Sequence, residues 1–221
     1  DFTILELLFV VAIISLLAAI LVPLLDMSRN KAKKTQCSSN LLQISMSIKL
    51  YADEYHYYPY TRRKAGAATY YWCYYNDGAE SKFDKSPIYE YLKSSNVLLC
   101  PAFHSGFKSI SPGLEMACSY GYNAEYVGGS PELNPAPPPE ADIEELLLKT
   151  APAKLIDIKA PDRTMLMTDS AFESAEGLEE SYYFWARYVF SQPAVEHKAR
   201  AHFRHRKMAV ASFCDGHIDD S

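Results

Sequence analysis

The chain has 221 residues, enough for one globular domain and a terminal segment, and its 22 basic and 27 acidic residues leave a net charge of −5. This composition lacks the basic surplus typical of nucleic-acid-binding proteins, so we expect no nucleic acid among its partners. The five cysteines include no C-x-x-C pair, which argues against a zinc site. The sequence also lacks a glycine-rich phosphate loop and a nucleophile elbow, and we expect neither enzymatic activity nor a required cofactor.

The first quarter of the chain predicts one long helix. No charged residue lies between Leu7 and Leu25, and a helix of this length matches the roughly 30 Å hydrocarbon core of a bilayer. The run is too long for a secretory signal peptide, lacks a basic start and carries Glu6 at its edge, so we interpret it as a membrane anchor. After this run no glycine or proline occurs before Pro59, and the predicted helix covers about residues 2–56.

The two halves of this helix differ in character. Residues 1–28 are apolar all round, whereas residues 29–56 are amphipathic and need a domain to pack against, which we expect residues 57–221 to form. Pro23 lies inside the apolar half, where a proline costs about 3 kcal/mol in an isolated helix. It indicates either a simple kink or a point at which the helix melts locally. The predicted packing stripe is Cys37, Leu41, Ile44, Ile48, Tyr51 and Tyr55.

Short strands and aromatic loops dominate the predicted head. Residues 55–75 hold eight tyrosines and Trp72, which we expect to pack over the sheet or at a subunit contact rather than to bind sugars. Short helices are predicted after Pro87 and over residues 140–148. The predicted strands cover residues 97–100, 119–123, 154–158, 164–169 and 208–214.

The start of the chain resembles a known family. The run FTILELL over residues 2–8, ahead of an apolar helix, is similar to the processed N-terminus of type IV pilins and type II secretion pseudopilins. In that family a prepilin peptidase cuts before a Phe, which is then N-methylated, and the fifth mature residue is Glu. Counting Phe2 as the first mature residue makes Glu6 the fifth and places Pro23 where the family has its helix-breaking proline. Asp1 then stands where the family's precursor carries Gly.

The far end of the chain resembles a pilin-like family from planctomycete and Lentisphaera-type bacteria. His205, nine further residues and then Asp215-Gly216 match its H-x9-D-G signature, and Asp215-Gly216 also predicts a two-residue hairpin turn. Other segments similar to that family begin at Cys100, Ser119 and Asp169. Together the resemblances imply an α+β, type IV pilin-like fold, in which a long N-terminal α-helix packs against a small antiparallel β-sheet with long loops.

The resemblance implies a structural subunit that polymerises through its N-terminal helix into an extracellular type IV pilus-like filament. The implied partners are other copies of the chain, the inner membrane before assembly, the prepilin peptidase and the assembly machinery. Glu6, for which we expect no partner in its own helix, would pair with the terminal amine of an adjacent subunit and set the register, while Pro23 would let the helix unwind locally. The alternatives are a periplasm-spanning secretion pseudopilin and a minor tip adhesin that binds polysaccharide through Tyr/Trp loops.

A cation site is a weaker expectation. Asp169, His205 and Asp215 come from elements that can lie side by side, and related pseudopilins hold calcium in their C-terminal region. Calcium prefers six to eight oxygen ligands, and two carboxylates fall short of that number. We therefore expect that Asp215-Gly216 forms a turn to which His205 hydrogen-bonds.

The cysteine pairing is not determined by the sequence. Cys100 and Cys118 lie in one loop-rich region and are our preferred disulfide pair. Cys37 is then either free or paired with Cys73.

Overall fold

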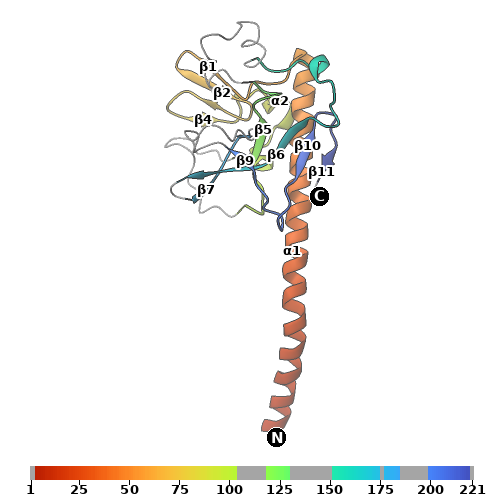
Figure 1. Ribbon diagram of the computed structural model, residues 1–221. Coiled ribbons are helices and arrows are strands. Elements are labelled where there is room, and N and C mark those ends of the chain that lie inside the picture. The colour runs from red at the N-terminus through yellow and green to blue at the C-terminus, as the bar shows by residue number, and fades with distance from the viewer. Residues whose placement is uncertain (1–2, 104–117, 130–150, 175–176, 185–198, 220–221) are drawn as a thin grey trace.

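A single long helix extends through the whole length of the molecule. The computed structural model describes residues 3–103, 118–129, 151–174, 177–184 and 199–219. Helix α1 runs from Ile4 to Tyr55, and the head packs against its C-terminal half while its N-terminal half projects alone (Figure 1). The predicted helix and the α+β class are both confirmed.

Local chemistry explains where α1 begins and ends. Thr3 is the N-cap, and its side chain and that of Glu6 form a reciprocal capping box that satisfies two backbone N–H groups of the first turn. At the other end His56 adopts a left-handed conformation with φ of 65°, and Pro59 follows three residues later. The helix continues through Pro23, which has no N–H to donate to the carbonyl of the preceding turn.

The predicted stripe on α1 forms one wall of the core. Its first four members are fully buried, and the buried face continues through Ala52, whereas Tyr51 is half-buried and Tyr55 is exposed. The last two rings stack on each other with centroids 4.5 Å apart. The fully buried face therefore ends at Ala52, about one turn before the predicted end of the stripe at Tyr55. The buried members of the predicted stripe are Cys37, Leu41, Ile44 and Ile48.

A seven-stranded sheet packs against α1 in the order β11-β10-β6-β5-β8, with β7 and β9 also paired to β6. All of its pairs are antiparallel except β5 with β8. The hydroxyl of Ser45 on α1 donates to that of Ser212 on β10 at 2.7 Å, which ties the sheet to the helix inside the core. The strands are β5 (Tyr120–Asn123), β6 (Met165–Ser174), β7 (Gly177–Glu180), β8 (Tyr183–Phe184), β9 (Arg200–Ala201), β10 (Ala211–Phe213) and β11 (Ile218–Asp219).

A second sheet of four antiparallel strands lies at the end of the head farthest from the projecting half of α1 (Figure 1). It contains much of the aromatic segment, and its strands are β1 (Arg62–Ala65), β2 (Ala68–Tyr71), β3 (Tyr75–Asn76) and β4 (Ser81–Lys82). The short helix α2 (Tyr89–Leu92) follows, as predicted after Pro87.

Two predicted strands are wrong. The first half of the segment at 97–100 belongs to the 3-10 helix η1 (Ser95–Leu98), and the segment at 154–158 contains the 3-10 helix η2 (Leu155–Asp157). Apolar runs this short have no periodicity that separates a strand from a single helical turn. The strands predicted at 119–123, 164–169 and 208–214 correspond to β5, β6 and β10, and the helix predicted at 140–148 lies outside the described residues.

Gly121 explains how β5 fits at the centre of the sheet. A Cβ atom at this position would lie 2.5 Å from Oγ of Ser170 on β6 and 2.8 Å from the carbonyl carbon of Tyr183 on β8. Real Cβ atoms do not approach so closely, and only glycine lets the three strands meet here. The backbones of β5 and β8 therefore pass closely at this glycine.

Candidate functional site

The projecting half of α1 is the largest apolar surface of the described chain. Its residues from Ile4 to Leu25 are all exposed, and the head covers none of them (Figure 1). By length and composition α1 can cross a membrane, and it is the one helix among the described residues that can.

Glu6 lies at the tip of this surface and has partners in its own helix, contrary to our expectation. Its Oε2 accepts hydrogen bonds from the backbone N–H of Thr3 and from the Thr3 hydroxyl, each at 2.9 Å. The Glu6 N–H in turn donates to the Thr3 hydroxyl at 3.3 Å. The T-x-x-E spacing that signals this capping box was present in the sequence. Phe2, the other predicted assembly residue at this end, lies outside the described residues.

A disulfide between Cys37 and Cys100 fastens the head to α1, with the Cα atoms 5.3 Å apart. The predicted pair of Cys100 with Cys118 is therefore wrong. Cys118 lies instead beside Cys73, and both are buried free thiols. Burial, followed by the neighbouring Cys118 thiol, raises the pKa of Cys73, so this thiol is kept protonated.

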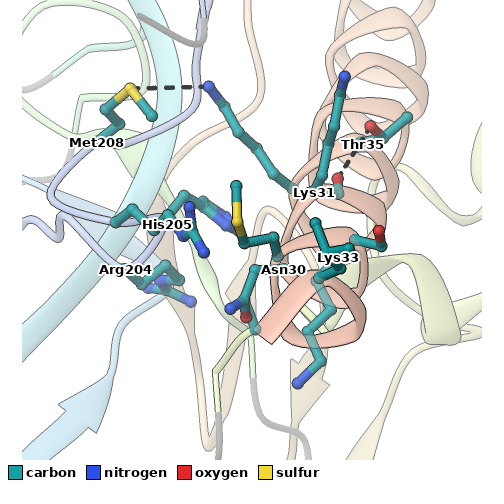
Figure 2. A pocket seen from close by; sticks show the side chains of 13 residues that line it. Asn30, Lys31, Lys33, Thr35, Arg204, His205 and Met208 are labelled. Carbon is teal, nitrogen blue, oxygen red and sulfur yellow. Dashed lines mark hydrogen bonds between the residues drawn. The ribbon is translucent and has the colours of Figure 1, made fainter. Parts of the chain in front are cut away.

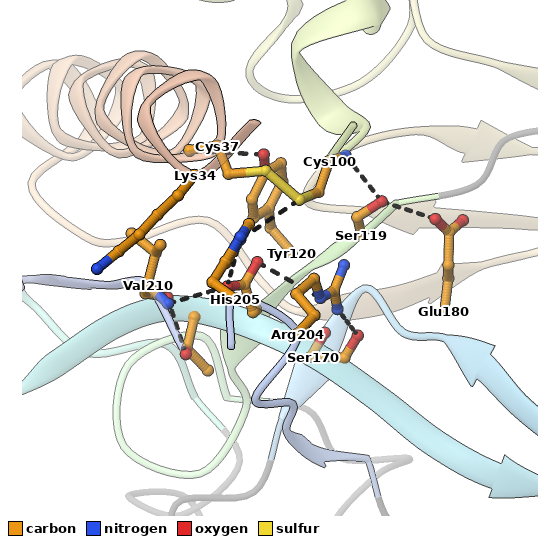
Figure 3. Close-up of polar contacts among 12 residues, drawn as sticks. Lys34, Cys37, Cys100, Ser119, Tyr120, Ser170, Glu180, Arg204, His205 and Val210 are labelled. Atoms are coloured by element: carbon orange, nitrogen blue, oxygen red, sulfur yellow. Dashed lines mark hydrogen bonds and ion pairs between the residues drawn. A yellow bond between two sulfur atoms is a disulfide. The ribbon is translucent and has the colours of Figure 1, made fainter. Parts of the chain in front are cut away.

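A buried ionic cluster lies directly behind the disulfide (Figure 3). Asp169 on β6 is fully buried, and its Oδ2 accepts from the backbone N–H of Val210 at 2.9 Å and lies 3.3 Å from Nε2 of His205. Oδ1 is 3.6 Å from Nε of Arg204, too long for a hydrogen bond but close enough for an ion pair. The same nitrogen of His205, Nε2, lies 3.6 Å from Sγ of Cys100.

Arg204 was given no role at the sequence level, although its side chain is only 2% exposed. Its Nη2 donates to the carbonyl of Ser170 at 2.6 Å, and its guanidinium lies over the ring of Phe103 at 4.1 Å. Burial lowers the pKa of the guanidinium, and the Asp169 carboxylate opposes that shift. No local sequence pattern marks Arg204, since its partners come from β6 and from the segment after Cys100.

Asp169, His205 and Asp215, the weak candidates for a cation site, do not all come together, because Asp215 lies elsewhere. Asp169 contacts Val210 before β10, whereas Asp215 follows β10 at the other end of that strand. Asp215 is exposed, and its Oδ1 accepts from the backbone N–H of His217 at 3.1 Å and lies 2.7 Å from the His217 ring. His205 therefore does not hydrogen-bond the Asp215-Gly216 turn, contrary to our expectation.

The described residues contain one group of three close metal-ligating side chains, and it does not form a metal site. Cys37, Cys100 and His205 place their ligand atoms within 4.8 Å of one another. Both sulfur atoms are bonded in the disulfide and are not available as thiolate ligands.

The Asp215-Gly216 turn forms, although its loop is longer than predicted. Ser212 pairs with Ile218 and the N–H of Phe213 donates to the carbonyl of His217, so the loop consists of Cys214, Asp215 and Gly216. Gly216 has φ of 102°, the conformation that a three-residue hairpin requires at its last position. The carbonyl of Asp215 accepts from Nζ of Lys49 at 2.7 Å, which anchors the turn to α1.

The aromatic segment is divided between the core and the surface. Trp72 is fully buried, and its Nε1 donates to the carbonyl of Tyr182. Tyr58, Tyr71 and Tyr74 are buried with it, while Tyr55, Tyr57 and Tyr70 are exposed. Part of the segment therefore packs in the head, as expected, and its exposed rings leave the expected subunit contact as a prediction.

Comparison of the chain with protein-family models, curated proteins and solved structures finds no match. Inferences about function therefore rest on the geometry above and on the sequence resemblance.

Proposed function

We propose that this chain is a structural subunit of an extracellular type IV pilus-like filament, which polymerises through α1. The observation that supports it best is the exposed apolar half of α1, on a helix whose other half carries a folded head. Before assembly this half would span the inner membrane, and in the filament it would pack against the same half of neighbouring copies.

The apolar surface is large enough that leaving it in water is unfavourable, which favours its burial in lipid or protein. Between Ile4 and Leu25, 16 large apolar side chains are exposed. At a lower value of about 1.5 kcal/mol for each side chain, leaving them in water forgoes roughly 24 kcal/mol. That exceeds the typical net stability of a folded domain, about 5–15 kcal/mol. A membrane or a helical bundle supplies such burial, and the proposed subunit uses each in turn.

Glu6 would set the register of the bundle. The hydrogen bonds that the Glu6 carboxylate accepts from Thr3 both use Oε2. The proposed pairing with the terminal amine of an adjacent copy would therefore use Oε1. Such a pair stabilises an apolar bundle chiefly because the alternative is an uncompensated buried charge. Only one axial offset between neighbouring helices satisfies it.

The same features suit a secretion pseudopilin, and abundance in filaments sheared from the cell surface separates the two functions. A polysaccharide-binding tip subunit has less support, because Trp72 is buried and hydrogen-bonded in the core. We also propose that the chain is not an enzyme, since the carboxylate of the Asp169–Arg204–His205 cluster is fully buried and pairs with the other two side chains.

Electron microscopy of filaments tests the proposal. The Glu6→Ala variant is expected to remain membrane-inserted, as judged by resistance to carbonate extraction, and to lose filaments. Asp26→Ala is the matched control, because it removes a carboxylate from the same helix just beyond the apolar run, and it should form filaments. Normal filament yield from Glu6→Ala would contradict the pairing, and failure of the wild-type chain to insert would contradict the membrane stage.

A further inference from the structure

A cavity of about 610 Å³ opens where α1 leaves the base of the head (Figure 2). Leu24 and Met27 contribute apolar wall from the end of the apolar run, and Met208 contributes it from the head. The rest of the lining is rich in cations, from α1 on one side and from the segment around His205 on the other. The cationic residues of the lining are Lys31, Lys33, Lys34, Arg204 and Arg206.

A strained turn on the head side carries Arg206 of the lining and, next to it in the chain, the further cation Lys207. His205 and Met208 exchange backbone hydrogen bonds at 3.0 and 3.2 Å, which leaves Arg206 and Lys207 as a two-residue hairpin loop. Both loop residues have positive φ, 54° and 70°, and both are exposed. Asn-Gly is the usual sequence for such a turn, because other side chains are strained there. Two long cationic side chains at this position indicate a role that outweighs the strain.

Arg204 adds a buried donor to the same cavity. Its side chain is only 2% exposed, yet its Nη1 has no hydrogen-bond partner in the described part of the chain. Buried polar groups are nearly always hydrogen-bonded, so this guanidinium N–H has the capacity to donate to an acceptor from outside the described residues.

The cavity lies at the depth of lipid headgroups if α1 spans a bilayer. At 1.5 Å per residue, Lys31 is about 9 Å beyond Leu25, where the apolar run ends. The headgroup region extends roughly 5–8 Å beyond the hydrocarbon on each side. Cα–Cβ bonds of a helix tilt toward its N-terminus, so lysines beyond the span lean back toward the membrane. Asp26, the one acid nearby on α1, does not line the cavity.

We propose that this cavity binds the phosphate-bearing headgroup of an anionic glycerophospholipid in the leaflet from which the head emerges. The lysine and arginine side chains would bind the phosphodiester, and the apolar wall would cover the glycerol and the first acyl carbons. The inference rests on the membrane stage of the proposed function and gives that stage a lipid preference.

Lipid binding by the full chain tests the proposal. The chain would be reconstituted in nanodiscs with equal amounts of phosphatidylglycerol and phosphatidylcholine, and the lipids that remain bound would be counted by native mass spectrometry. The variant Arg206→Asn/Lys207→Gly removes both charges and relieves the strained turn. We expect its preference for phosphatidylglycerol to fall roughly ten-fold or more, while its thermal midpoint stays level or rises.

Arg63→Gln/Lys64→Gln is the matched control, because it removes the same two charge types from exposed β1, at the other end of the head. It should keep the wild-type preference. Equal retention of both lipids by the wild type, or an unchanged preference in the turn variant, would overturn the lipid site. Displacement of phosphatidylglycerol by millimolar inorganic phosphate would also overturn it in favour of a free-phosphate site.

The membrane stage is tested separately in the same preparation. Insertion of the wild type into nanodiscs of phosphatidylcholine alone, without any headgroup preference in mixed nanodiscs, would refute the lipid site and leave the filament subunit standing. A wild-type chain that fails to insert at all would refute both. A turn variant that keeps its lipid preference but no longer polymerises would assign the cluster to a subunit contact and so overturn the lipid site.

Discussion

The disulfide between Cys37 and Cys100 should supply a large share of the stability of the head. It closes a loop with a sequence separation of 63 residues, from the buried face of α1 to the segment after η1. In the chain-entropy description, a loop of that length stabilises the folded state by about 4 kcal/mol. For a head of this size, that corresponds to a fall in the unfolding midpoint of roughly 10 °C when the bond is absent.

The perturbation is Cys37→Ala/Cys100→Ala in the full chain, and the assay is thermal unfolding in mild detergent, followed by circular dichroism. The matched control is Cys118→Ala, which removes a buried free thiol that the sequence had favoured as the partner of Cys100. The control should unfold within a few degrees of the wild type and retain one disulfide in peptide mapping. A fall of less than about 3 °C in the double variant, or a mapped bond between Cys100 and Cys118, would refute the reasoning.

Two further predictions concern buried ionisable groups. Asp169→Asn removes the carboxylate that faces both Arg204 and His205, and we expect a loss of about 3 kcal/mol or more in denaturant unfolding, because a buried arginine is left without its counter-ion. Burial raises the pKa of Glu180, against the opposing hydrogen bond from Ser119, so the folded state holds this proton to higher pH than the unfolded state does. The stability that this group contributes is therefore greatest below the unfolded-state pKa and falls as pH rises through the raised folded-state pKa. The variant Glu180→Gln should be more stable than the wild type at pH 7, and its free energy of unfolding should lack this dependence on pH.

The controls for these predictions lie on the surface of the same sheet. Asp215→Asn, at the exposed hairpin turn, should cost less than about 1 kcal/mol. An equal loss from both aspartates would contradict a special role for the buried cluster. Identical pH profiles for the wild type and Glu180→Gln would show that this carboxyl has the same pKa in both states.

Some of the molecule follows directly from the order of residues along the chain. Helix α1 follows from patterns within short stretches of the sequence. Apolar residues three or four apart define its packing stripe, and Thr3 and Glu6, three apart, form its capping box. Pro59 marks where it must stop. The amphipathic half of the helix also predicts a domain packed on one face of it. The α+β class came from the family resemblances together with the short strands predicted in the head. The first half of strand β6 was recognisable from the apolar run Met165-Leu166-Met167, which follows a turn at residues 160–163.

Other features were decided by tertiary structure, because their partners lie far apart in the sequence. Cys100 pairs with Cys37 rather than Cys118 because η1 brings it to the buried face of α1, and no spacing rule contains that information. The pairing of β9 and β10 with β6 places Arg204 and His205 beside Asp169, while β10 carries Asp215 away to its opposite end. The sequence alone thus determines a helix whose apolar half must be buried in lipid or protein and whose amphipathic half must pack against a domain. The long-range packing of the head determines which cysteines, acids and cations meet at its base.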